Sequence, residues 1–224
     1  MPKKSSKTST DCRPLAVYVT SHGFGHLNRV SAVLNRIPPE IPITIRSNAN
    51  LFPHWHERLR RHATLEPHVS DVGTVHPPGD SVTVDVESTL DRAERVHAEA
   101  MADIENEADR LRSEETAVVL SDISPVPLVA AHRAGIPGYL MANFTWADIY
   151  HPYARAMGPR ARRLVADLRH AYGHASGVFR VEPALRMSWL GKAVQPGMVV
   201  NPGRDRRAEL LQSLDLDPSS RLAY

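Results

Sequence analysis

The chain has 224 residues, of which 42% are hydrophobic and 23% charged, and its formal net charge is +2 with the histidines neutral. This length suits one large α/β domain, or one domain with the beginning of a second, and the composition supports a packed core. So balanced a charge gives no reason to expect binding to nucleic acid or to a membrane surface. Cys12 is the single cysteine, which excludes an internal disulfide and a thiolate metal cluster.

The first residues look like neither a signal peptide nor a membrane anchor. Residues 1–11 are rich in Lys, Ser and Thr and lack the apolar core of a signal peptide. No apolar run in the sequence approaches the length of about 20 residues that spans a bilayer. We therefore expect a soluble, cytoplasmic protein with a disordered tail.

Strand-like and helix-like segments alternate along the chain, beginning with a strand over residues 15–20 and a helix over 26–36 that ends before Pro38 and Pro39. Further strands are expected at 41–46, 69–73, 117–120, 138–142, 177–181 and 198–200. Further helices are expected at 50–61, 86–111, 125–134, 154–172 and 206–214. This alternation predicts an α/β fold with a doubly wound, mainly parallel, Rossmann-like sheet.

We expect the chain to divide into three parts. Residues 1–13 form the tail, residues 14–200 the Rossmann-like domain, and residues 201–224 a connection to a further domain. Residues 221–224 resemble the first residues of a new strand. Because domain boundaries fall in exposed linkers rather than inside strands, we expect a second domain beyond Tyr224.

A glycine-rich turn, Ser21-His-Gly-Phe-Gly-His26, joins the first strand to the first helix. In a doubly wound sheet, ligands bind at the carboxyl ends of the strands, where Asp122 and Asn143 follow the fourth and fifth strands. The first and fourth strands are usually neighbours, so we expect His26 and Asp122 to face each other. A carboxylate that accepts from one imidazole nitrogen leaves the other free to act as a base toward a substrate hydroxyl.

The same residues also have structural interpretations. His26 could bond a backbone carbonyl, Asp122, Asn143 and Thr145 could cap helices, and Trp146 could fill the core. A nicotinamide site is disfavoured, because the turn has two of the three fingerprint glycines and no acidic residue follows the second strand. The spacings of the histidines predict no metal site.

The Gly25-His26 pair that opens the first helix resembles the pair at this place in two-domain GT-B glycosyltransferases. The whole turn more closely resembles the glycosyltransferase-like half of plant L-arabinokinases and their bacterial stand-alone relatives. Residues 71–85, 121–125 and 143–150 share this resemblance, which extends from about residue 15 to the end of the sequence. It implies the N-terminal half of a GT-B fold.

What the resemblance implies is nucleotide-sugar-dependent glycosyl transfer to an acceptor hydroxyl, with His26 as the catalytic base and Asp122 orienting it. A further set of residues would shape the substrate-binding pocket: His22, Gly23, Phe24, Gly25 and Asn143. The nucleotide sugar is a co-substrate, and neither a cofactor nor a metal is expected. The partners implied are a sugar or other hydroxyl-bearing acceptor and a C-terminal donor-binding domain, in cis or in trans. The isolated chain is therefore expected to be inactive.

Two alternatives stay open. One is a non-catalytic sugar-binding or regulatory module, like the domain fused to a sugar kinase in the arabinokinases; this chain has no kinase phosphate loop. The other is a half-enzyme that pairs with a separate donor-binding subunit.

Overall fold

A parallel sheet forms the centre of the molecule. The computed structural model describes residues 12–201, 203 and 205–221, and its seven strands lie in the order β3-β2-β1-β4-β5-β6-β7 with every neighbouring pair parallel. The strands are β1 (Leu15–Val19), β2 (Ile43–Ser47), β3 (Thr64–Pro67), β4 (Val118–Asp122), β5 (Gly138–Ala142), β6 (Gly177–Glu182) and β7 (Val194–Met198). The predicted α/β fold class with a parallel, doubly wound sheet is confirmed.

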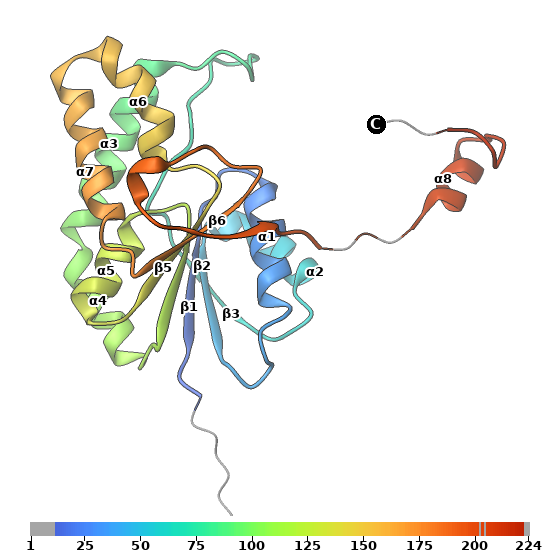
Figure 1. The fold of residues 1–224 in the computed structure, drawn as a ribbon, viewed down its shortest axis with the longest axis horizontal. Helices are drawn as coiled ribbons and strands as arrows, with labels where there is room; N and C mark the ends of the chain where they lie inside the picture. The colour runs from blue at the N-terminus through green and yellow to red at the C-terminus, as the bar shows by residue number, and fades with distance from the viewer. Residues whose placement is uncertain (1–11, 202, 204, 222–224) are drawn as a thin grey trace, which may run out of the picture.

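Helices cover both faces of this sheet (Figure 1). The helices of the described chain are α1 (Phe24–Leu34), α2 (Phe52–Arg58), α3 (Val86–Ala102), α4 (Ile104–Ser113), α5 (Val126–Ala134), α6 (Trp146–Met157), α7 (Pro159–Tyr172) and α8 (Arg207–Ser213), with short 3-10 turns η1 (Ala49–Leu51) and η2 (Ser188–Leu190); all but α8 belong to the layers on the sheet. On one face, α1 and α2 pack Leu27, Val30 and Trp55 against the sheet. The helices from α3 to α7 cover the other face, so β1 and β4 are buried on both sides and read as apolar runs.

The adjacency of β1 and β4 positions the site. Leu15 pairs with Val118 at one end of the two strands, and Val19 pairs with Asp122 at the other. The expectation that the first and fourth strands are neighbours is confirmed. The turn that follows β1 therefore lies beside the carboxyl end of β4.

The two edge strands differ from the prediction. The third strand is β3 (Thr64–Pro67) rather than residues 69–73, and the last is β7 (Val194–Met198) rather than residues 198–200. Residues 70–72 are buried but irregular, so burial in this segment is not accompanied by strand structure. Edge strands carry few buried side chains, so no apolar run marks them in the sequence.

Two predicted long helices are each two helices. The apolar stripe over residues 86–111 is interrupted at Asp103, where α3 ends and α4 begins, although Ile104 and Leu111 continue the buried face. The helix expected over 154–172 begins earlier, at Trp146, and is broken at Gly158, whose φ is 86°. A positive φ of this kind favours glycine, and Pro159 then starts α7. The first helix also begins two residues earlier than expected, at Phe24.

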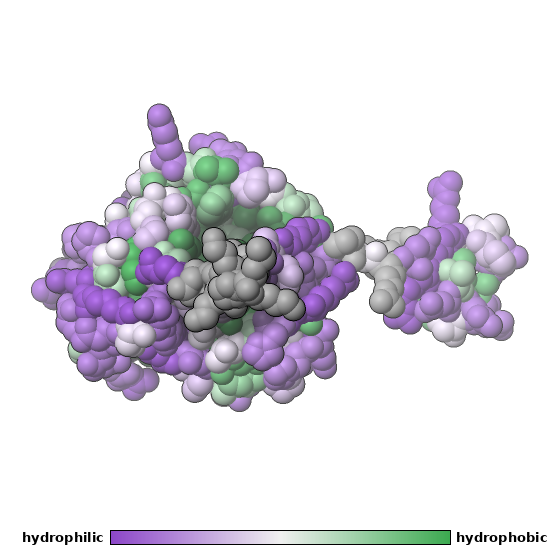
Figure 2. Space-filling view, turned by 90° about the horizontal axis from the view of Figure 1, so that it is seen from below, coloured by the Kyte–Doolittle hydropathy of each residue, from purple (hydrophilic) through white to green (hydrophobic). Residues whose placement is uncertain are grey.

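The N-terminal end of the described chain is bonded to the domain, whereas the C-terminal helix stands apart from it. Arg13, placed by the sequence in the tail, donates from Nε to the Glu115 carbonyl and from Nη2 to the Thr116 carbonyl, both at 3.0 Å. Residues 1–11 and the expected strand start at 222–224 lie outside the described residues. At the other end, α8 stands apart from the sheet and its helices, as Figure 2 also shows from below. Among the described residues, no helix has both the length and the apolar character needed to cross a membrane.

Candidate active site at the carboxyl ends of β1, β4 and β5

The turn after β1 places His26 in the first turn of α1. Gly23 precedes the helix with φ 94° and ψ 154°, a conformation that a residue with a Cβ rarely adopts. Helix α1 then starts at Phe24, and His26 is only 8% exposed. The glycine in the turn therefore fixes the direction in which α1 leaves the sheet and directs His26 toward β4.

The structure brings His26 and Asp122 together. His26 Nδ1 lies 2.9 Å from Asp122 Oδ2, and the Asp122 side chain is completely buried at the end of β4. A carboxylate only accepts hydrogen bonds, so Nδ1 carries the proton and Nε2 keeps its lone pair. This is the tautomer in which the outer imidazole nitrogen can take a proton from a substrate.

Arg29 completes this cluster, and the sequence analysis missed it. Its Nε donates to Asp122 Oδ1 at 3.1 Å, its Nη2 donates to the same oxygen, and its Nη1 donates to Asn143 Oδ1 at 2.8 Å. The two carboxylate oxygens are thus divided between His26 and Arg29. Arg29 Nη2 also lies 3.0 Å from His26 Nδ1, but both atoms carry protons in this arrangement and form no hydrogen bond.

A sequence signal for Arg29 does exist. It lies three residues after His26, so both side chains project from the same face of α1. Because an arginine on a helix is usually a solvated surface residue, that spacing alone does not identify it.

Asn143 belongs to the same group of side chains, but its neighbours have structural roles. Asn143 follows β5 and accepts from Arg29. Thr145 caps α6 by accepting from the Asp148 backbone N–H at 3.2 Å, and Trp146 is 2% exposed. The structure therefore shows Thr145 as a helix cap and Trp146 as a core residue.

His22 does not reach the His26–Asp122 pair. Its ring packs edge-on against Trp146, with 5.5 Å between ring centroids, and lies against Gly73. A Cβ on Gly73 would lie 1.8 Å from His22 Nδ1, so glycine there leaves the space that the ring occupies. Burial lowers the pKa of His22, and His26 and His76 lower it further, which favours the neutral ring.

A second buried carboxylate, Asp71, lies next to the site. It accepts from Thr20 Oγ1 at 3.1 Å and from Trp146 Nε1 at 2.8 Å. Burial raises the pKa of Asp71 to about 6, against the opposing effect of these two hydrogen bonds, and the nearby Asp122 carboxylate adds to the increase. Sequence reasoning singled out the segment that contains Asp71 but gave this carboxylate no role.

A chain of aromatic contacts leads from the imidazole of His26 through Phe144 to Trp146. Phe144 packs edge-on against His26 with 5.7 Å between centroids, and against Trp146 with 5.3 Å. Phe24 is 51% exposed and contacts the ring of His54. In the described part of the chain, no group of three or more His, Cys, Asp or Glu side chains is arranged to hold a metal ion.

The most informative relative by sequence is a large plant kinase. No family model matches the chain. The L-arabinokinase of Arabidopsis thaliana is 29% identical over 203 residues, which is 90% of this chain and 19% of that protein. The chain therefore spans about a fifth of the curated relative that it matches.

Solved structures of plant glycosyltransferases share the fold. UGT2 of Phytolacca americana, in complex with UDP-2-fluoro-glucose and pterostilbene, superimposes with a TM-score of 0.54 at 15% identity, over 90% of this chain and 57% of that one. The chain has the Rossmann-like fold of a GT-B glycosyltransferase half. A UDP-glucosyltransferase of Polygonum tinctorium gives a TM-score of 0.51 at 12% identity, over 91% of this chain and 57% of its own. The expected resemblance to GT-B glycosyltransferases and to L-arabinokinase is confirmed, and the chain spans little more than half of these structures.

Proposed function

We propose that this GT-B-like chain supplies the acceptor side of a glycosyl-transfer site, in which His26 is the base. The observation that carries the proposal is the contact of His26 Nδ1 with the buried Asp122 carboxylate, which leaves Nε2 free. The fold supports it, because UGT2 of Phytolacca americana, whose fold is similar, holds UDP-2-fluoro-glucose in its complex.

The proposed reaction is one displacement. The acceptor hydroxyl oxygen attacks the anomeric carbon of a nucleotide sugar, and its proton passes to His26 Nε2. A carbon–oxygen bond forms to the acceptor, and the bond from the anomeric carbon to the nucleotide phosphate breaks, so the nucleotide leaves and the configuration is inverted. Asp122 then stabilises the imidazolium through Nδ1–H.

Open space for an acceptor lies beside this base. A Cβ built on Gly23 or on Gly25 would meet no atom within 4 Å, so both glycines face open space next to His26. We propose that these glycines, with His22, Phe24 and Asn143, line the acceptor site. The exposed ring of Phe24 would cover one side of the acceptor.

We further propose that residues 14–200 form the acceptor-side domain and that residues 201–224 lead to the donor-binding half. Each compared glycosyltransferase structure is covered over 57% of its length by this chain. The half that binds most of the nucleotide would act in cis or in trans, as a covalent continuation or as a separate subunit.

The test is sugar transfer by this chain joined to, or mixed with, a donor-binding half, with a panel of nucleotide sugars and hydroxyl acceptors. We expect His26→Ala to lower turnover by about 10²-fold or more, the range for loss of a general base. His56→Ala, at an exposed position on α2, is the matched control and should retain full turnover. Unchanged turnover of His26→Ala would reject the assignment of the base.

A second candidate function is a sugar-binding module without transferase activity. It is favoured by the match to 19% of L-arabinokinase, where a corresponding segment is a small part of a larger protein. Saturable binding of a sugar by the chain, without transfer from any donor in the same panel, would support this candidate over the first.

A further inference from the structure

A cavity in the helical layer lies apart from the site around His26. It is lined by α3, α5 and α7, opens to the surface, and has a volume of about 470 Å³. This size falls within the range of small-molecule sites, about 300–1,000 Å³. Figure 1 shows these three helices side by side on the face of the sheet opposite α1 and α2.

The cavity has an apolar floor. The floor residues come from all three helices: Met101, Val129, Leu164 and Ala171. Ala98 of α3 also borders the cavity, at an exposed position. Leu164, Val129 and Ala171 are buried, so they are part of the core that supports the cavity. Such a floor suits the hydrocarbon or ring portion of a ligand.

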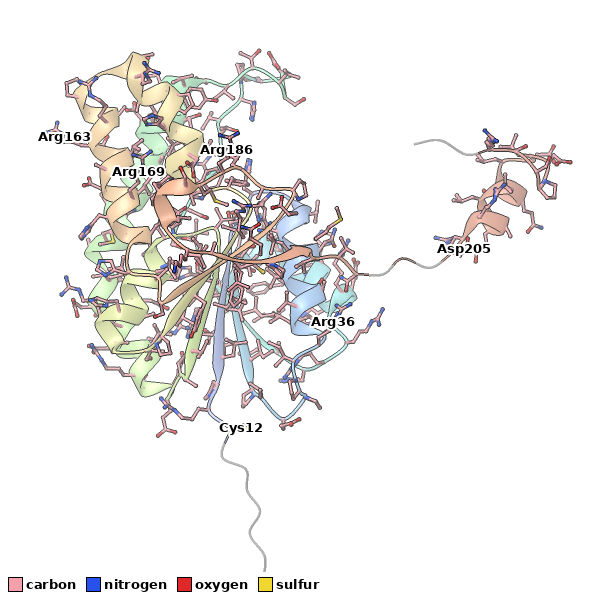
Figure 3. All side chains as sticks on the ribbon, in the orientation of Figure 1. Cys12, Arg36, Arg163, Arg169, Arg186 and Asp205 are labelled. Atoms are coloured by element: carbon pink, nitrogen blue, oxygen red, sulfur yellow. The ribbon has the colours of Figure 1, made fainter. Side chains whose placement is uncertain are left out.

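Basic side chains line the rim above this floor. Arg133 on α5 and Arg163 on α7 both border the cavity, and Arg163 projects from α7 in Figure 3. Of the two acidic residues at the rim, Glu94 is already paired with Arg160. The ion pair of Arg133 with Glu105 is long, at 3.6 Å, and exposed on both sides, so it competes weakly with a ligand.

The other acidic residue at the rim is Asp167, and His97 also borders the cavity. Burial lowers the pKa of His97, and the Asp167 carboxylate opposes this effect. His97 Nδ1 is a buried atom that has no hydrogen-bond partner among the described residues. Because this nitrogen is buried, it is not the contact for a ligand in the cavity; His97 is placed to report binding because the residue borders the cavity.

Histidines crowd one end of the same cavity. His170 and His174 both border it, with ring centroids 5.2 Å apart, and His132 lies 4.5 Å from His174. Burial lowers the pKa of His174, and the neighbouring His132, His170 and Arg133 lower it further. The lowered pKa favours the neutral ring of His174, so the positive charge at the cavity comes from Arg133 and Arg163 and not from the histidines.

We propose that the cavity between α3, α5 and α7 binds a small anionic molecule that carries an apolar body. The anionic group, a phosphate or a carboxylate, pairs with Arg133 and Arg163 at the rim, and the body rests on the apolar floor. This binding site is independent of the proposed transfer reaction, since none of its lining residues belongs to the site around His26.

The test uses the complete 224-residue chain and phenyl phosphate as the probe, followed by calorimetric titration and by the ring C–H resonances of the histidines. We expect saturable binding that shifts the resonances of His97, His170 and His174. Arg133→Gln combined with Arg163→Gln should weaken binding by about tenfold or more, because two charge-assisted hydrogen bonds are lost. Ala98→Trp, at an exposed position on α3, should abolish binding by filling the cavity.

Matched controls separate this site from general attraction of anions. Arg162→Gln removes an exposed charge from the same helix, outside the cavity lining, and should leave affinity unchanged. Inorganic phosphate, which lacks the apolar body, should bind more weakly than phenyl phosphate. The proposal is wrong if phenyl phosphate does not saturate, if Arg162→Gln weakens binding as much as the double variant does, or if Ala98→Trp still binds.

Discussion

Arg29 places a cation beside the buried Asp122 carboxylate. An ionised carboxylate at a completely buried position costs several kcal/mol unless a cation and hydrogen bonds compensate it. Arg29 supplies both, through its contacts with Asp122 Oδ1, and its own side chain is 11% exposed. Arg29 and His26 together supply the hydrogen bonds that compensate the burial of this carboxylate.

Removing this cation should destabilise the fold. Arg29→Met is expected to lower the free energy of unfolding by about 3 kcal/mol or more, since Asp122 loses its cation in a buried position. Combining it with Asp122→Asn should restore part of that loss, because a neutral amide needs no cation. Urea denaturation measures both variants.

The matched control for Arg29 is Arg36→Met. Arg36 lies just beyond the end of α1 and is exposed (Figure 3), so its loss should change stability by no more than about 0.5 kcal/mol. Equal destabilisation by Arg29→Met with and without Asp122→Asn would show that Arg29 acts through packing and not through the charge of Asp122.

At the scale of whole elements, Arg46 connects three strands and helix α4 through hydrogen bonds and ion pairs. Tyr18, Arg46 and Glu66 stand in one row across β1, β2 and β3. Arg46 Nη1 donates to Tyr18 Oη at 2.9 Å and its Nε lies 3.0 Å from Glu66 Oε2. On the same face, Glu107 and Glu114 of α4 and its C-cap approach Arg46, whose side chain is 0% exposed. The row therefore anchors α4 to the edge half of the sheet.

Loss of Arg46 should leave these carboxylates partly buried without their shared cation. We expect Arg46→Met to lower the free energy of unfolding by about 3–5 kcal/mol. Arg60→Met, at an exposed position after α2, serves as the control and should have little effect in the same denaturation experiment. A loss of stability no greater than that of the control would show that packing of α4 does not depend on this cluster.

The strands differ in how well the sequence marks them. Strand β5 matches its predicted range, Gly138–Ala142, because a central strand is buried on both faces and reads as an uninterrupted apolar run. The edge strands β3 and β7 were displaced in the prediction, because their side chains are mostly half-buried or exposed. The pattern of apolar residues in a sequence indicates which residues are buried. At the edge of a sheet the strand residues are mostly not buried, so this pattern does not locate the strand.

The sequence likewise predicted only part of the candidate site. Strand order and the glycine turn were enough to predict that His26 and Asp122 face each other, because both residues are fixed by backbone topology. Arg29 and Asp71 could not be predicted, since their partners are set by side-chain packing between segments far apart in the sequence. The catalytic roles assigned to these residues stay predictions.

At the scale of the whole molecule, Asp71 makes stability depend on pH. The pKa of Asp71 is raised from 3.8 to about 6 in the folded protein. Between these two values the folded state binds more protons than the unfolded chain, so the free energy of unfolding falls as pH rises. The contribution of Asp71 is complete below about pH 4 and is lost above about pH 6, a total of about 3 kcal/mol.

Asp71→Asn removes this titration and keeps an acceptor for Trp146 Nε1. We expect the variant to gain stability relative to the natural chain when the pH is raised from about 4 to about 7. Urea denaturation at several pH values measures the difference, and Asp109→Asn, at an exposed position on α4, is the control. A difference between Asp71→Asn and the natural chain that stays constant over this range would contradict the raised pKa.

The pairing of β1 with β4 also dictates an order of assembly. Val19 and Asp122 are register partners although the whole of β2, β3, α3 and α4 lies between them in the chain. During synthesis, β1 can pair with β2 early, but its other edge stays open until β4 has emerged. Closure of so long a loop is slow because its entropy must be overcome before any contact is gained. His26 is thus made well before the carboxylate that it contacts, which follows 96 residues later in the chain.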